Sequence, residues 1–226
     1  MAHKTQKRIK GLAIARPIIY GNVAAPLGDE KVLVPEHTHR WTVSLRGVNN
    51  EDISYYVRKV VFKLHETYPQ PTRTVDKPPY EVTETGWGEF EIAIKMYFQT
   101  ISGEKPVTLF HHLRLHPTDA LGNPTLVDPT KPPINQPVAA YHYDEIVFNE
   151  PVEHFAQVLL ENRSSELPAK STLSNPYSLQ AEQDELARLE KVNQQVEQTI
   201  EEYRERMATA TKQHSQLKQE IAALEA

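Results

Sequence analysis

The segment from Phe90 to Phe98, FEIAIKMYF, decides the fold class of this 226-residue chain. Its apolar residues occupy every second position, and Glu91, Lys95 and Tyr97 lie among the positions between them. Successive side chains of a β-strand point to opposite faces of the sheet. The alternation therefore predicts a strand with one face in an apolar core.

Similar short segments, rich in Val, Ile, Tyr and Phe, occur on both sides of this strand and are separated by turn residues. The 17 prolines against eight glycines also favour stiff turns and extended connections over a helical bundle. We therefore predict a mainly β fold, an antiparallel sandwich or barrel. The expected strands are Arg8–Tyr20, His39–Gly47, Val57–His65, Tyr80–Thr83, Phe90–Phe98, Val107–Leu115 and Tyr141–Phe148.

The rest of the chain divides by composition. Five prolines between Asp119 and Pro137 indicate a loop inserted between strands, and Val152–Arg163 has the apolar spacing of a short amphipathic helix. We expect a β-domain over residues 8–163, a linker over 164–178 and a coiled coil over 179–226.

The C-terminal coiled coil is predicted from a seven-residue repeat. From Gln180 onward there is neither proline nor glycine, and good helix formers dominate. Polar or small residues interrupt the seam at Asn193, Ala210 and His214, which favours a partner helix over a homodimer. The other seam residues are Leu186, Leu189, Val196, Ile200, Tyr203, Met207, Leu217, Ile221 and Leu224.

Composition excludes several classes of function. The chain has no cysteine, so disulfides, thiolate catalysis and zinc sites with cysteine ligands are ruled out. No apolar run approaches the length of about 18 residues that a membrane span needs. The formal net charge of −5 argues against strong binding of nucleic acid by the whole protein.

Two aromatic residues stand where a ligand could reach them. Tyr68 comes just before Pro69, where a strand must end, and Trp87 lies on a turn between Gly86 and Gly88. If the two rings meet, they form a slot for a flat, neutral group bearing an amide, such as an acylated lysine. An unmodified lysine would have to lose the water around its ammonium group. The alternative is a loop tryptophan that only caps the end of the domain.

Four blocks of sequence together resemble the YEATS domain, a reader of acylated histone lysines. They are HTHRW at His37–Trp41, VVFKLHETYP at Val60–Pro69, KPPYE at Lys77–Glu81 and TETGWGEF at Thr83–Phe90. With its coiled coil, the chain is similar to the fungal YEATS subunit shared by a variant-histone-exchange remodeller and a histone acetyltransferase complex.

This resemblance implies a fold and a ligand. The fold would be an eight-stranded immunoglobulin-like sandwich. Tyr68 and Trp87 would enclose the acyl amide, and the backbone N–H of Trp87 would bind the acyl carbonyl. His65 and Thr67 would supply polar contacts. Thr67 stands where many members of the family have serine, and its additional methyl group bears on acyl preference.

The wall and open end of the slot follow from the same resemblance. Gly86, Gly88 and Phe90 would shape the wall, and His37 would lie at the open end, where several members have an aromatic residue. The resemblance implies no cofactor. It implies a nuclear protein that binds an acylated histone tail, expected to be that of histone H3. The coiled coil would bind other subunits of the complexes.

Three other functions compete with this interpretation. A metal enzyme could use His37, His39, His111, His112 and His116, but carboxylates at matching spacing are missing and Arg114 would repel a cation. A scaffold would assemble a complex without binding acyl-lysine. Sequence-specific DNA reading is disfavoured because no groove-reading helix is evident. The basic residues Lys4, Lys7, Arg8, Lys10 and Arg16 are most simply a solvated arm.

Overall fold

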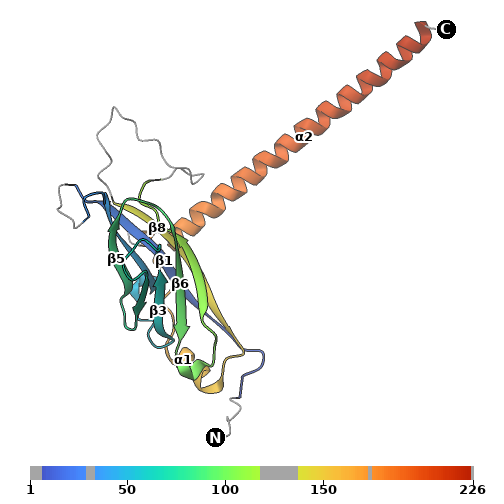
Figure 1. Cartoon of the computed structure of the whole chain (residues 1–226). Coiled ribbons are helices and arrows are strands. Elements are labelled where there is room, and N and C mark those ends of the chain that lie inside the picture. Colours follow the sequence, from blue (N-terminus) through green and yellow to red (C-terminus); the bar gives the residue numbers. More distant parts are fainter. Residues whose placement is uncertain (1–6, 29–33, 118–136, 173–174, 225–226) are drawn as a thin grey trace. The chain divides into compact units, whose positions relative to one another are not determined.

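The computed structural model describes residues 7–28, 34–117, 137–172 and 175–224. Over these residues, eight β-strands form two four-stranded sheets, and a long helix lies near the C-terminus (Figure 1). The core lies between the sheets. The predicted fold class, an eight-stranded antiparallel sandwich followed by a C-terminal helix, is confirmed.

All neighbouring strands within the two sheets are antiparallel. The first sheet has the order β5 (Tyr80–Gly86), β2 (His39–Gly47), β1 (Ala13–Pro26), β8 (Val138–Asn149). The second has the order β4 (Thr72–Val75), β3 (Val57–Lys63), β6 (Glu91–Phe98), β7 (Val107–His112). The connections contain η1 (Val48–Asn50), η2 (Thr100–Ser102) and helix α1 (Glu153–Glu161).

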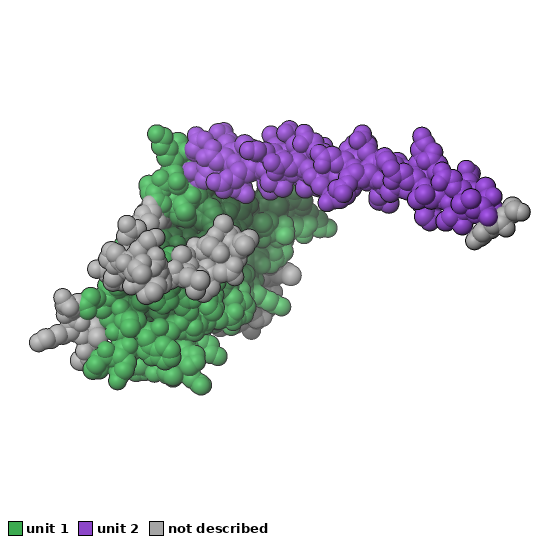
Figure 2. Space-filling model, turned by 90° about the horizontal axis from the view of Figure 1, so that it is seen from above, with its two compact units in different colours: residues 1–177 green, residues 178–226 purple. Residues whose placement is uncertain are grey.

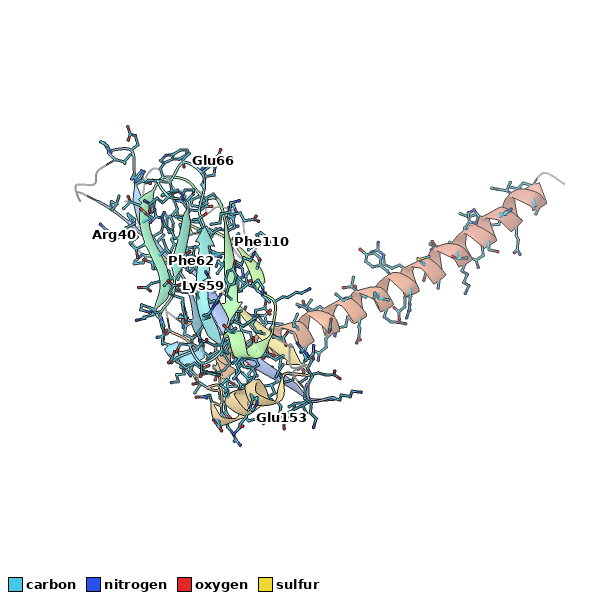
Figure 3. The ribbon with its side chains drawn as sticks, turned by 60° about the horizontal axis from the view of Figure 1, so that its bottom comes forward. Arg40, Lys59, Phe62, Glu66, Phe110 and Glu153 are labelled. Carbon is cyan, nitrogen blue, oxygen red and sulfur yellow. The ribbon has the colours of Figure 1, made fainter. Side chains whose placement is uncertain are left out.

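The alternation in the sequence identifies the core face of each sheet. In β6, Ile92 and Ile94 have no exposed surface, and the neighbouring Glu91 is exposed. Phe62 of β3 and Trp41 of β2 are equally buried. Figure 3 places Phe62 within the sandwich. Full burial of each such side chain stabilises the fold by roughly 1.5–3 kcal/mol.

The first strand was predicted over Arg8–Tyr20, but β1 begins and ends later in the chain, at Ala13 and Pro26. Its start follows Gly11, whose φ of +72° is unsuited to a strand. Its continuation passes through Gly21, where an added Cβ would lie 2.1 Å from the carbonyl oxygen of Ala140. Glycine there permits the close approach of β8 and does not end the strand.

Other predicted bounds moved by a few residues. β4 was not predicted, because four residues close to Pro71 give too short an alternating pattern. β5 and β8 extend beyond the predicted Tyr80–Thr83 and Tyr141–Phe148, whereas the predicted Val57–His65 and Val107–Leu115 end early, at Lys63 and His112. Helix α1 falls inside the predicted Val152–Arg163.

Arg16 does not belong to a solvated basic arm. It is 6% exposed, and its Nη2 donates to the carbonyl oxygens of Leu159 and Asn162 at the end of α1. Its Nε donates to the Tyr55 hydroxyl at 2.8 Å. A cation at a helix C-terminus interacts favourably with the helix dipole, so Arg16 fastens α1 to β1. Lys4 lies outside the described residues.

Helix α2 (Leu179–Leu224) contains the predicted seam, and none of its residues is buried. Compact units comprise residues 1–177 and 178–226 (Figure 2). The side chain of Ser178 accepts a hydrogen bond from the Ala181 N–H at 3.1 Å, as an N-cap residue does. None of the helices in the described ranges is both long and apolar enough to cross a membrane.

The predicted linker is fastened to the sandwich. The Ser165 N–H donates to the Glu51 carboxylate, and the Tyr177 hydroxyl donates to the Tyr141 carbonyl at 2.7 Å. The two compact units divide after Tyr177. The predicted domain bounds, 8–163, 164–178 and 179–226, stay a prediction. The predicted Pro-rich loop lies, except for Pro137, outside the described residues.

Candidate functional site

A cavity of about 400 Å³ lies at the end of the sandwich where the chain leaves β3 and passes from β5 to β6. In Figure 3, the labelled Glu66, on the loop after β3, lies at the end of the sandwich opposite Glu153 of α1. The residues lining the cavity are Val34, His37, His65, Thr67, Tyr68, Pro69, Trp87, Gly88, Glu89 and Phe90.

Tyr68 is held firmly on one side of the cavity. Its ring packs edge-on against buried Trp41, with 5.8 Å between centroids, and lies 5.6 Å from the ring of Phe90. Its hydroxyl donates to the Thr85 carbonyl at 3.1 Å. Burial raises the pKa of Tyr68, which keeps this donor protonated. The hydroxyl therefore positions the ring and is not free at the mouth of the cavity.

Gly86 is needed for this arrangement. It ends β5 opposite His39 of β2, and an added Cβ would lie 2.3 Å from the Tyr68 hydroxyl and 3.3 Å from Trp41 Nε1. A larger residue would displace the tyrosine. Gly86 contacts Tyr68 from behind and does not itself line the cavity.

Trp87 stands across the cavity and is 69% exposed, as its place on a loop predicted. At the neighbouring Gly88, an added Cβ would meet nothing within 4 Å. Among the residues that the structure describes, none accepts a hydrogen bond from the backbone N–H of Trp87. A large aromatic face, and an amide donor with no partner among the described residues, are thus available to a ligand.

Polar side chains are paired around the cavity. His65 Nδ1 lies 3.0 Å from the Thr67 hydroxyl, and it accepts the Thr67 backbone N–H at 3.4 Å. His37 Nδ1 lies 2.7 Å from the hydroxyl of Thr85, the residue whose carbonyl holds Tyr68.

Glu89, the residue after Gly88, is the one acidic residue among the described residues that line the cavity. Burial alone would raise its pKa, but the backbone N–H groups of Leu115 and His116 and the side chain of Arg114 together lower that pKa. The carboxylate accepts the two N–H groups at 2.7 and 3.1 Å. Glu89 is thus ionised and occupied by protein donors.

Seven of the eight site residues named from the sequence line this cavity, and Gly86 supports it from behind. The sequence interpretation missed Val34, Pro69 and Glu89 as lining residues. Pro69 and Glu89 lie inside the quoted motifs, so their position in the chain could have indicated them. Nothing in the sequence separates Val34 from its neighbours.

The histidines named as possible metal ligands do not form a metal site within the described ranges. His39 packs edge-on against His116, and buried His111 packs against His142. Burial lowers the pKa of His111 to about 3, so this residue stays neutral. No group of three or more His, Asp or Glu side chains within the described ranges could hold a metal ion.

A second cavity, of about 680 Å³, lies elsewhere on the domain, beside Thr42, Ser44 and Arg46 of β2 and next to Tyr141 of β8. None of the site residues named from the sequence lines it.

Comparison with known proteins identifies the family. The YEATS family model matches residues 36–117. Protein AF-9 homolog of Eremothecium gossypii is 47% identical over 210 residues, which cover 92% of this chain and 97% of that protein. The crystal structure of the Yaf9 YEATS domain bound to H3K27ac is 49% identical, covers 69% of this chain and 99% of that one, and superimposes with a TM-score of 0.59. The Yaf9 YEATS domain recognising an H3K122suc peptide gives the same identity and coverage, with a TM-score of 0.57. The chain belongs to the YEATS family.

Proposed function

We propose that this protein reads acylated lysine on a histone tail, that of histone H3, through the cavity between Tyr68 and Trp87. The observation that carries the proposal is one fixed and one exposed aromatic ring on opposite sides of a cavity, beside a free backbone N–H. Yaf9, about half identical in sequence, forms structures with acylated histone H3.

The chemistry of the cavity favours a neutral amide over an ammonium group. The rings of Tyr68 and Trp87 can pack against both faces of a planar amide, and the Trp87 N–H can donate to its carbonyl oxygen. An unmodified lysine would lose water without gaining a partner of opposite charge, because Glu89 is occupied by Arg114 and the backbone. His65, Thr67 and His37 would contact the polar part of the ligand.

The wider role that we propose is recruitment. The apolar seam of α2 is exposed along the helix, which supports binding to a helix of another subunit. The protein would then anchor nuclear chromatin-remodelling and histone-acetyltransferase complexes at acylated nucleosomes, without catalysing a reaction itself. The second candidate function is a scaffold that uses α2 alone, and the same exposed seam supports it.

Titration of the full chain with histone H3 tail peptides tests the proposal. Acetylated peptide should bind at least tenfold more tightly than unmodified peptide, and a flat unsaturated acyl group should bind as well as acetyl or better. Trp87→Ala should weaken binding more than tenfold, because the ring contributes on the order of 2 kcal/mol. Removing a side chain that is 69% exposed should leave the domain folded.

Equal binding of acetylated and unmodified peptides would mean that the peptide is held only by electrostatic attraction and that the cavity does not recognise the acyl group. That result would favour the scaffold function. Unchanged binding of acetylated peptide by a folded Trp87→Ala protein would place the site elsewhere.

A further inference from the structure

Trp87 has little around it to fix its own orientation. Its side chain is 69% exposed, and no described residue forms a hydrogen bond with its backbone or indole nitrogen. Its neighbour Gly88 adds no side chain, and the space beside Gly88 is open. The orientation of the ring must therefore depend on how the two ends of its loop are held.

Glu89 holds the end of this loop that leads into β6. Its Oε1 accepts the backbone N–H groups of Leu115, at 2.7 Å, and His116, at 3.1 Å. Its Oε2 lies 3.2 Å from Arg114 Nη1 and 4.0 Å from His112 Nε2. One carboxylate thus ties the residue after Gly88 to three successive residues of the segment that follows β7.

That segment is itself fixed from the opposite sheet. Asn22 of β1 has no exposed surface; its Oδ1 accepts the Arg114 N–H at 3.0 Å and its Nδ2 donates to the Arg114 carbonyl at 2.8 Å. His111 Nε2 donates to the same Oδ1 at 2.7 Å. The Leu113 N–H also donates to the Phe90 carbonyl at 2.8 Å. Glu89 therefore binds a rigid support.

The other end of the loop is held by Thr38, the residue before β2. The Gly86 carbonyl accepts the Thr38 N–H at 3.1 Å, and the Thr38 hydroxyl lies 2.8 Å from His39 Nδ1. The ring of His39 packs edge-on against His116, with centroids 5.0 Å apart. His116 thus contacts Glu89 at one end of the loop through its N–H, and it is linked to Gly86 at the other end indirectly, through His39 and Thr38.

We propose that Glu89 is a positioning residue: by binding the segment 114–116 through its carboxylate, it holds the Trp87 loop in the orientation that accepts the acyl group. The inference rests on the proposed function of the cavity. Although Glu89 lines the cavity, its carboxylate oxygens already accept from Arg114, Leu115 and His116, so its effect on binding passes through Trp87.

Substitution of Glu89 in the full chain tests this role. Glu89→Ala removes the hydrogen bonds between the Glu89 carboxylate and Arg114, Leu115 and His116. It should weaken binding of an acetylated H3 peptide at least fivefold. Glu89→Gln keeps an oxygen acceptor for the two N–H groups but loses the charge facing Arg114, so its loss should be smaller. Glu91→Ala is the matched control, because Glu91 is an exposed residue of β6, and its affinity should equal that of the wild type.

The indole N–H resonances separate positioning from general destabilisation, because the two tryptophans differ in environment. In Glu89→Ala, the Trp87 resonance should shift or broaden, while that of buried Trp41 should stay in place. If Glu89→Ala does not fold, the same measurements on Glu89→Gln decide. Wild-type affinity with an unchanged Trp87 resonance in the folded variant would overturn the inference.

Trp87→Ala distinguishes failure of this inference from failure of the proposed function. If Trp87→Ala loses binding and Glu89→Ala does not, the positioning role is wrong and the binding site stands. If neither variant loses binding, the proposed function fails.

A pH series gives an independent test. The pKa of Glu89 is lowered in the folded protein, so its contribution is complete above its ordinary pKa and is lost as the pH falls through the lowered value. The charged or titratable groups around it are Arg114, His112, His116 and His39. The affinity difference between wild type and Glu89→Gln should be full at pH 7 and should shrink in strong acid. A difference that is constant with pH would contradict the role of the charge.

Discussion

Apolar side chains are buried in the sandwich and exposed on helix α2. Ile94 of β6 has no exposed surface, whereas Ile200 in the seam of α2 is 46% exposed. The sandwich surrounds its apolar residues with two sheets, and α2 has no buried residue. The sandwich encloses its apolar residues, whereas helix α2 presents an exposed apolar seam.

Replacing one isoleucine by alanine in each region tests this difference. Ile94→Ala should lower the free energy of unfolding of the sandwich by about 2–5 kcal/mol, because it leaves a cavity in a packed core. Ile200→Ala should leave that free energy unchanged, since alanine favours the helix and no core contact is lost. Urea unfolding followed by the fluorescence of buried Trp41 measures both.

An equal loss of stability in the two variants would contradict the separation of the regions. It would mean that the seam of α2 contributes to the core of the sandwich.

The close packing should extend to the binding end of the sandwich, where Gly86 lies against Tyr68. Gly86→Ala should cost about 1–3 kcal/mol of stability and weaken acetyl-lysine binding, because the added Cβ would lie 2.3 Å from the Tyr68 hydroxyl. Gly88→Ala is the matched control, and its Cβ meets nothing within 4 Å. Gly86→Ala should lower both the unfolding temperature and the peptide affinity, whereas Gly88→Ala should leave the unfolding temperature unchanged. Similar behaviour of the two variants would show that Tyr68 is not rigidly held.

Most of the fold could be predicted because local pattern and burial agree. Alternation in β6 and β3 marked the core face correctly, and the seven-residue repeat marked α2. The errors arose where distant strands decide local structure. Gly21 resembles a strand end in the sequence, yet it continues β1 because Ala140 of β8 approaches closely. The short β4 exists because β3 offers it an edge.

In the candidate site, too, local features could be predicted and contacts between distant residues could not. Tyr68 and Trp87 stood out because of the residue types beside them, and the family resemblance supplied their partners. The support of the loop could not be read from the sequence. It joins Glu89 to a segment about 26 residues later and to Asn22 on the other sheet, and only the folded chain brings these residues together.

In the function proposed above, the sandwich binds the acylated lysine and α2 binds the other subunits. The most direct measurement compares the full chain with a chain ending at Tyr177, which keeps the linker contacts with Glu51 and Tyr141. The two should bind acetylated H3 peptide with equal affinity, while only the full chain should co-purify with the other subunits of its complex. Weaker peptide binding by the shortened chain, or its co-purification at the level of the full chain, would contradict the claim.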